Sequence, residues 1–145
     1  MSKEPAFWDA SALVPLCVHE SNSRQAQLQL RQSLPVVWWA SNIEVHSALG
    51  RLHRQGKLRD VEKKGALARL DVLSRACREI LPSDSLRDLA RQLLDTYELR
   101  AADSLQLAAA LTWCQHRPSR RAFLSADQRL SKCAAAAGFS VIALS

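Results

Sequence analysis

One stretch shows how this chain passes from a strand into a helix, namely Pro35-Val36-Val37-Trp38-Trp39-Ala40-Ser41-Asn42-Ile43-Glu44. Residues 35–40 are short, β-branched and aromatic, and a proline opens them, which is typical of a buried strand. The helical pattern that starts at Ser41 has apolar residues at the spacing of one helix face, namely Val45, Ala48, Leu49 and Leu52. The stretch therefore predicts a strand, then a helix, with Glu44 just beyond the carboxyl end of the strand.

The same alternation runs through the rest of the chain. Strands are also predicted at residues 6–8, 78–81, 122–124 and 139–144, and helices at residues 10–18, 22–33, 59–77, 85–97, 101–114 and 130–137. Short strands that alternate with helices, without hairpin turn signals, predict a parallel sheet covered on both faces. We expect residues 1–145 to form a single α/β domain with three layers, α/β/α, around a central parallel sheet of about five short strands.

The composition favours a folded protein with an acidic partner. Hydrophobic residues make up 48% of the 145, and the formal net charge is +6 with a pI of about 9.6. A disordered chain is excluded by this hydrophobic content, and nucleic acid is the first candidate for the partner. The basic residues between Arg51 and Lys64, with Arg120 and Arg121, are candidates for phosphate contacts, but they fit a solvated surface or a protein partner equally well.

Cysteines and histidines give no sign of a disulfide framework or a zinc site. Cys17, Cys77, Cys114 and Cys133 are widely spaced and form no C-x-x-C pair, and the four histidines show no ligand spacing. No secretory signal and no apolar stretch of membrane-spanning length are present in the sequence. We therefore expect reduced thiols, no membrane partner and a cytoplasmic location.

Tryptophan is abundant, and three of the four residues lie in or next to predicted strands. Trp38 and Trp39 are adjacent, so their side chains point to opposite sides of one strand, and both can be core residues if the sheet is covered. Trp8 directly precedes an aspartate. Core packing is the preferred interpretation for all three, and base stacking is the alternative.

Four acidic residues occupy positions where a parallel sheet builds its sites. Asp9, Glu44 and Asp127 each follow a predicted strand, and the carboxyl ends of parallel strands meet at one edge, where ligands bind. Asp103 lies near the start of the helix at residues 101–114, which is apolar nearly all round. An acid in a buried helix cannot simply face water, so Asp103 joins the other three as a candidate.

Each acid also has a structural interpretation. Ser41 and Glu44 match a capping box, and Ser125 with Gln128 match another. Asp9 can be a helix N-cap, and Asp103 and Asp127 can each favour a helix dipole. Four carboxylates at one edge, however, repel one another unless a cation or raised pKa values compensate. Their oxygens suit Mg²⁺ or Mn²⁺, which would lower the pKa of a water that attacks a phosphate.

Four segments resemble, in order, the motifs of PIN-domain proteins. These are Phe7-Trp8-Asp9-Ala10-Ser11-Ala12-Leu13-Val14, residues 41–49 around Glu44, residues 99–108 around Asp103 and residues 123–130 around Asp127. The resemblance spans nearly the whole chain, and its nearest sub-type is the VapC-like toxin of type II toxin–antitoxin systems. No acid of the set is missing, so the resemblance implies an active enzyme.

The resemblance implies a metal-dependent endoribonuclease that hydrolyses RNA phosphodiesters with Mg²⁺ or Mn²⁺. It makes Asp9, Glu44, Asp103 and Asp127 the catalytic and metal-binding set, with Asp9 and Asp103 as direct ligands and the other two acting through water. Ser11 and Ser125 match small polar positions that touch water or phosphate, with helix capping as the alternative. The resemblance further implies a homodimer and a cognate antitoxin that inserts an Arg or Lys near the acids.

Three other functions remain as alternatives. A non-catalytic PIN-like module would bind RNA or a protein and use the carboxylates only as caps. A DNA-directed nuclease would use the same metal chemistry. A phosphatase of the haloacid-dehalogenase type is disfavoured, because that family needs a second aspartate where this chain has Ser11.

Overall fold

The computed structural model describes residues 3–145 and contains a five-stranded sheet in which every neighbouring pair is parallel. The strands, in chain order, are β1 (Glu4–Trp8), β2 (Ser33–Trp38), β3 (Arg78–Ile80), β4 (Ala122–Ser125) and β5 (Ser140–Ala143). Their order across the sheet is β3-β2-β1-β4-β5. The predicted parallel sheet of about five short strands is confirmed.

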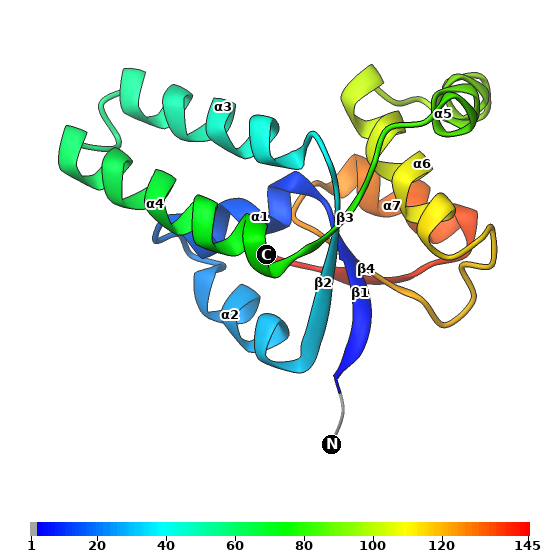
Figure 1. Cartoon of the computed structure of the whole chain (residues 1–145), viewed down its shortest axis with the longest axis horizontal. Coiled ribbons are helices and arrows are strands. Elements are labelled where there is room, and N and C mark those ends of the chain that lie inside the picture. The colour runs from blue at the N-terminus through cyan, green and yellow to red at the C-terminus, as the bar shows by residue number, and fades with distance from the viewer. Residues whose placement is uncertain (1–2) are drawn as a thin grey trace.

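Helices cover both faces of this sheet (Figure 1). They are α1 (Ala10–Cys17), α2 (Ser23–Gln32), α3 (Ser41–Arg54), α4 (Asp60–Ala76), α5 (Asp84–Thr96), α6 (Ala101–Trp113) and α7 (Gln128–Ala137). Helices α1 to α4 lie on one face, and α5 to α7 lie on the other. The predicted α/β/α layering is therefore confirmed. Within residues 3–145, no helix combines the length and the apolar character needed to cross a membrane.

Alternate residues of the strands supply the two halves of the core. Phe7, Val36 and Phe123 point toward α5, α6 and α7, whereas Trp8 and Val37 point toward the other helix layer. The Phe123 ring stacks on the Phe7 ring with centroids 5.4 Å apart and also contacts the Phe139 ring. This two-sided burial explains why the strands read as continuous apolar runs.

The strand order reverses at β1, and this reversal positions the site. From β1 the chain proceeds to β2 and β3 on one side, and then returns to place β4 on the other side of β1. Ligands of open parallel sheets bind at such a switch point, beyond the carboxyl ends of the strands. The backbone N–H of Asp9 donates to the Leu124 carbonyl over 3.1 Å, which joins the ends of β1 and β4.

Two expectations about the second strand are wrong. The helix predicted at residues 22–33 ends at Gln32, because Ser33 is already extended in β2 and pairs with Glu4, and the next residue, Leu34, is 51% exposed. Trp39 lies beyond the end of β2 and is 47% exposed, so it is not a core residue. Core packing of Trp8 and Trp38 is confirmed.

Replacement of Phe123 by alanine is expected to lower the free energy of unfolding by about 3–5 kcal/mol, because it removes a fully buried ring and leaves a cavity. Leu34→Ala is the control, and its effect is expected to stay within about 0.5 kcal/mol because Leu34 is half exposed. Urea unfolding followed by circular dichroism measures both. Equal decreases in the free energy of unfolding of the two variants would contradict this account of the core.

Candidate functional site

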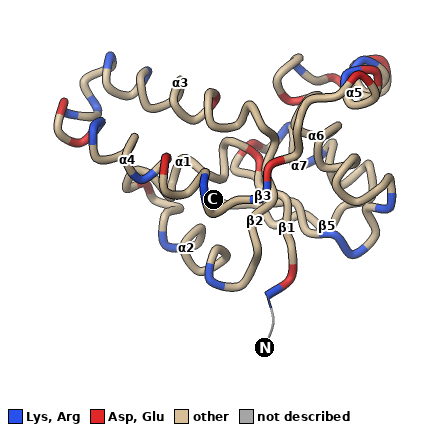
Figure 2. The backbone as a smooth tube through the Cα atoms, viewed as in Figure 1, with Lys and Arg blue, Asp and Glu red and all other residues tan. Residues whose placement is uncertain are grey.

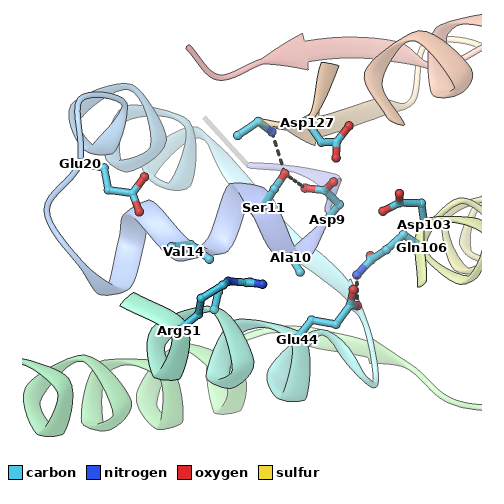
Figure 3. Close-up of a pocket in the computed structure, with 12 residues that line it drawn as sticks. Asp9, Ala10, Ser11, Val14, Glu20, Glu44, Arg51, Asp103, Gln106 and Asp127 are labelled. Carbon is cyan, nitrogen blue, oxygen red and sulfur yellow. Dashed lines mark hydrogen bonds between the residues drawn. The ribbon is translucent and has the colours of Figure 1, made fainter. Parts of the chain in front are cut away.

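All four predicted acids line one pocket of about 370 Å³ (Figure 3). Asp9 follows β1, Glu44 lies in the first turn of α3, Asp103 lies in the first turn of α6, and Asp127 directly precedes α7. The sheet edge and two helix layers thus bring together residues that are up to 118 positions apart. Ser11 also lines the pocket, whereas Ser125 is fully buried and does not line it.

Asp9 is the most deeply buried of the four acids, with 2% of its surface exposed. Its Oδ1 accepts a hydrogen bond from the Ser11 hydroxyl over 2.6 Å and one from the Ala12 N–H over 3.1 Å. Its Oδ2 accepts one from the Ser125 hydroxyl over 2.8 Å. Asp9 therefore caps α1, as the structural interpretation predicted, and lines the pocket at the same time.

Burial dominates the acidity of this carboxyl group. Loss of water raises the pKa of Asp9 to about 7, against an ordinary value of 3.8, although the hydrogen bonds from Ser11, Ser125 and Ala12 oppose that rise. The nearby charge of Asp127 raises it further. Three neutral donors thus stabilise the carboxylate less than its burial destabilises it.

The two serines hold Asp9 and the end of β4 together. The Ser11 hydroxyl donates to Asp9 and accepts the Ala126 N–H over 2.9 Å. The Ser125 hydroxyl donates to Asp9 and accepts the Asp127 N–H over 3.0 Å. Both hydroxyl groups are therefore engaged on the donor and the acceptor side.

The capping box predicted for Ser125 and Gln128 does not form. Asp127 is itself the N-cap of α7, and its Oδ1 accepts the Leu130 N–H over 2.9 Å. Ser125 instead ends β4 and is fully buried, because its hydroxyl bonds to Asp9. The Asp127 carboxylate, one residue before α7, therefore caps the helix in place of Ser125.

The capping box predicted for Ser41 and Glu44 is also wrong. Ser41 is the first residue inside α3, and the cap residue Ala40 offers no side-chain acceptor. The Gln106 amide reaches across from α6 instead, and its Nε2 donates to Ser41 Oγ over 2.9 Å and to Glu44 Oε2 over 2.6 Å. Glu44 is thus oriented by a neighbouring helix rather than by its own.

Gln106 is a site residue that the sequence reasoning missed. It is 1% exposed, lies one turn after Asp103 on α6 and lines the acidic pocket. Its Oε1 is buried and accepts no hydrogen bond from any described residue. A single amide in an otherwise apolar helix, three positions after an aspartate, is the signal that could have identified it.

The negative charges of neighbouring acids also raise the pKa values of Glu44 and Asp103. Burial raises the pKa of Glu44, the hydrogen bond from Gln106 lowers it, and the charge of Asp103 raises it. Burial likewise raises the pKa of the half-buried Asp103, and so does Asp127, whereas Arg100 and Arg129 lower it. The pocket therefore concentrates negative charge that the protein leaves partly uncompensated.

The oxygens of these side chains are of the type that binds divalent cations such as Mg²⁺ and Mn²⁺. As the side chains stand in residues 3–145, however, no three His, Cys, Asp or Glu residues form a group that could hold a metal ion. The acids face one pocket, but they would have to draw closer to share a cation. The arrangement therefore offers carboxylate oxygens at one pocket, and the pKa values of three of these acids are raised.

Replacement of Asp9 by asparagine is expected to remove a pH dependence of stability. The folded chain holds the Asp9 proton more tightly than the unfolded chain does, so the free energy of unfolding of the native protein falls as pH rises from about 4 to 7. With chelator present, Asp9→Asn should be more stable than the native protein above pH 7, by up to roughly 4 kcal/mol. Urea unfolding at several pH values measures this difference.

The control for that experiment is Asp71→Asn, which removes an exposed carboxylate on α4. It should leave the dependence of stability on pH almost as it is in the native protein. Parallel curves for the native protein and Asp9→Asn would show that burial of Asp9 does not raise its pKa.

Replacement of Gln106 by leucine is expected to raise the pKa of Glu44 further, because the donor that lowers it is lost. An NMR titration of the Glu44 side-chain carboxyl carbon measures the shift directly. Gln92→Leu, at an exposed position of α5, serves as the control and should leave the Glu44 titration unchanged. An unshifted titration in Gln106→Leu would refute the positioning role of this amide.

Two solved structures illustrate the proteins whose fold is similar to that of this chain. One similar chain comes from a toxin–antitoxin complex from Klebsiella pneumoniae, with a TM-score of 0.60 and 15% identity, over 86% of this chain and 88% of that one. Another is PAE2754 from Pyrobaculum aerophilum, with a TM-score of 0.60 and 17% identity, over 90% of this chain and 79% of that one. No family model and no curated protein matches the sequence. At these identities the likeness shows a shared fold, and one of the chains that share it belongs to a toxin–antitoxin complex.

Proposed function

We propose that this protein is a metal-dependent endoribonuclease of the PIN-domain type and the toxin of a toxin–antitoxin pair. The observation that carries the proposal is the convergence of Asp9, Glu44, Asp103 and Asp127 on one pocket, in a chain with a net charge of +6. A basic exterior attracts a polyanion, and an acidic pocket can hold the cation that phosphodiester hydrolysis uses. The four motifs that resemble PIN-domain proteins support the same assignment.

The donor set of the pocket fits Mg²⁺ or Mn²⁺. The carboxylates are hard oxygen ligands, and the unpartnered Oε1 of Gln106 adds a neutral oxygen beside them. Oδ1 of Asp9 already accepts two hydrogen bonds, but Oδ2 accepts only one and keeps a second lone pair for a cation. We assign direct coordination to Asp9 and Asp103, and contact through water to Glu44 and Asp127. When bound, the cation supplies Lewis acidity that lowers the pKa of the attacking water.

The protein's own residues prepare the site before a substrate arrives. Ser11 and Ser125 fix the orientation of the Asp9 carboxylate, and Gln106 fixes that of Glu44. Because the pKa of Asp9 is about 7, its proton has to leave before the carboxylate can bind a cation, which couples cation binding to pH. Ser11 lines the pocket and would lie next to a substrate phosphate there, whereas the buried Ser125 would act on the substrate only through Asp9.

The partners of this function follow from the same assignment. RNA is the substrate, and a cognate antitoxin that approaches the pocket with an Arg or Lys would neutralise the acids. The similar chain in the Klebsiella pneumoniae toxin–antitoxin complex supports a partner of this kind. A homodimer and a cytoplasmic location belong to the same proposal.

The non-catalytic module and the DNA-directed nuclease can each be compared with the ribonuclease. A non-catalytic RNA- or protein-binding module would need its carboxylates only as caps, and Asp9 and Asp127 do cap helices. Glu44 and Asp103 cap nothing, however, and still face the pocket, which favours the enzyme. A DNA-directed nuclease would use the same pocket, so only the substrate separates it from the ribonuclease.

Purified protein is expected to cleave single-stranded RNA when Mg²⁺ or Mn²⁺ is present and to stop when excess chelator is added. Asp9→Asn and Asp103→Asn should each reduce the cleavage rate by about 100-fold or more, because each removes a cation ligand worth several kcal/mol in the transition state. Gel analysis of labelled RNA, with a DNA strand of the same sequence beside it, measures the rates and the substrate preference.

Asp71→Asn and Asp95→Asn remove exposed carboxylates on α4 and α5 and are the matched controls. Both should cleave RNA at the native rate. Cleavage that survives chelator or both Asp9→Asn and Asp103→Asn would exclude the proposed mechanism, and faster cleavage of the DNA strand would replace the ribonuclease with a deoxyribonuclease.

A further inference from the structure

A second cavity, of about 780 Å³, adjoins the acidic pocket and shares Asp103 and Asp127 with it. Its other walls include Arg100, Arg129 and Lys132, and we call it the basic cavity. Arg100 directly precedes α6, and the other two cations lie one turn apart on α7, so they share a helix face. The basic cavity is large enough for a nucleotide-sized ligand.

The beginnings of two helices border this cavity. Residues that line it come from the start of α6 and from the first turn of α7. The N-terminus of a helix carries partial positive charge, and α6 has no side-chain cap there, because its cap residue is Arg100. Helix α7 is capped by the Asp127 carboxylate. The backbone at the start of α6 and the side chain of its cap residue, Arg100, thus add to the positive potential of the cavity.

The three cations have no structural partner. Arg100, Arg129 and Lys132 are exposed, and none of them donates a hydrogen bond or forms an ion pair with another of the described residues. The ion pairs found within residues 3–145 all lie elsewhere, on α3, α4 and α5. A salt bridge that stabilises the fold therefore does not explain why three cations occur at these positions.

Three cations and three carboxylates line the cavity. Two of the acids, Asp103 and Asp127, also line the acidic pocket, and the third is Glu98. Away from the shared wall, three cations face one carboxylate. Arg100 and Arg129 lie close enough to Asp103 to lower its pKa. Lys and Arg residues are spread along most elements of the chain (Figure 2), and Arg100, Arg129 and Lys132 line the same cavity as Asp103 and Asp127.

We propose that the basic cavity binds the phosphate next to the one that is cleaved, on the same RNA strand, through Arg100, Arg129 and Lys132. This inference rests on the proposed ribonuclease function. A strand whose scissile phosphate lies against Asp103 and Asp127 must continue past the shared wall, and the cations there can neutralise its next phosphate. The cavity thereby sets the register of the strand in the site.

The test compares two variants with the same net charge. The cavity variant combines Arg100→Ala, Arg129→Ala and Lys132→Ala. The control variant combines Arg24→Ala, Arg31→Ala and Arg75→Ala, which change exposed residues of α2 and α4 on the opposite face of the sheet. Binding of a short fluorescein-labelled single-stranded RNA is followed by fluorescence anisotropy at several salt concentrations. Chelator is present throughout, so that no strand is cleaved.

The cavity variant is expected to bind RNA more weakly, and the slope of log affinity against log salt should fall by about 0.7 for each phosphate contact that is lost. The control variant should keep the native slope. Equal slopes in the two variants, or no binding of RNA by the native protein, would overturn the inference.

A second measurement uses the native protein, in case the triple variant does not fold. Cys133 lines the basic cavity and Cys77 does not, and both thiols are half buried. RNA in chelator should slow the alkylation of Cys133 by a maleimide and leave that of Cys77 unchanged, as mass spectrometry of the peptides can show. Unprotected Cys133 at saturating RNA would count against the inference.

These results separate the two proposals. Cleavage of RNA with an unchanged salt slope in the cavity variant would retain the ribonuclease and remove the phosphate site. A reduced slope and protected Cys133 without any cleavage would retain the phosphate site and remove the ribonuclease.

Discussion

The burial of the Asp9 carboxyl group at the point where β1 and β4 diverge is the constraint on which the site depends. Two hydroxyl groups and one backbone N–H bond to it, and no described cation does. These donors are neutral, so they do not offset the loss of water, and the pKa of Asp9 rises to about 7. A protein that buries an acid in this way gives up stability at neutral pH, which is a cost usually met at functional sites.

The other features of the site are arranged around this carboxyl group. The donors to Asp9 come from the start of α1 and the end of β4, so the acid also joins two segments of the fold. Glu44 and Asp103 approach from the two helix layers, and Gln106 links α6 to α3 across the end of the sheet. A group of three cations lies beside Asp103 and Asp127, on the side where α6 and α7 begin. The result is an acidic centre with a basic flank, which suits a phosphodiester strand.

Much of this fold was predictable because strands and helices here carry strong local patterns. The order of the elements, the parallel sheet and the two helix layers all followed from short apolar runs that alternate with amphipathic segments. The errors arose where two local signals competed. Ser41 and Ser125 both matched capping boxes, yet contacts from Gln106 and Asp9 determine what these two serines do. Trp39 fitted a strand by its type, but β2 ends one residue before it.

Periodicity and residue type are local properties, and they were enough to predict an α/β chain with acids after three of its strands. They also predicted Asp103 as an acid in a buried helix. The shared pocket of the four acids, the place of Gln106 in it, and the position of Arg100, Arg129 and Lys132 beside it became clear from the folded chain. These relations depend on strand order and on helix packing across the sheet, which bring distant residues together and which no local pattern records.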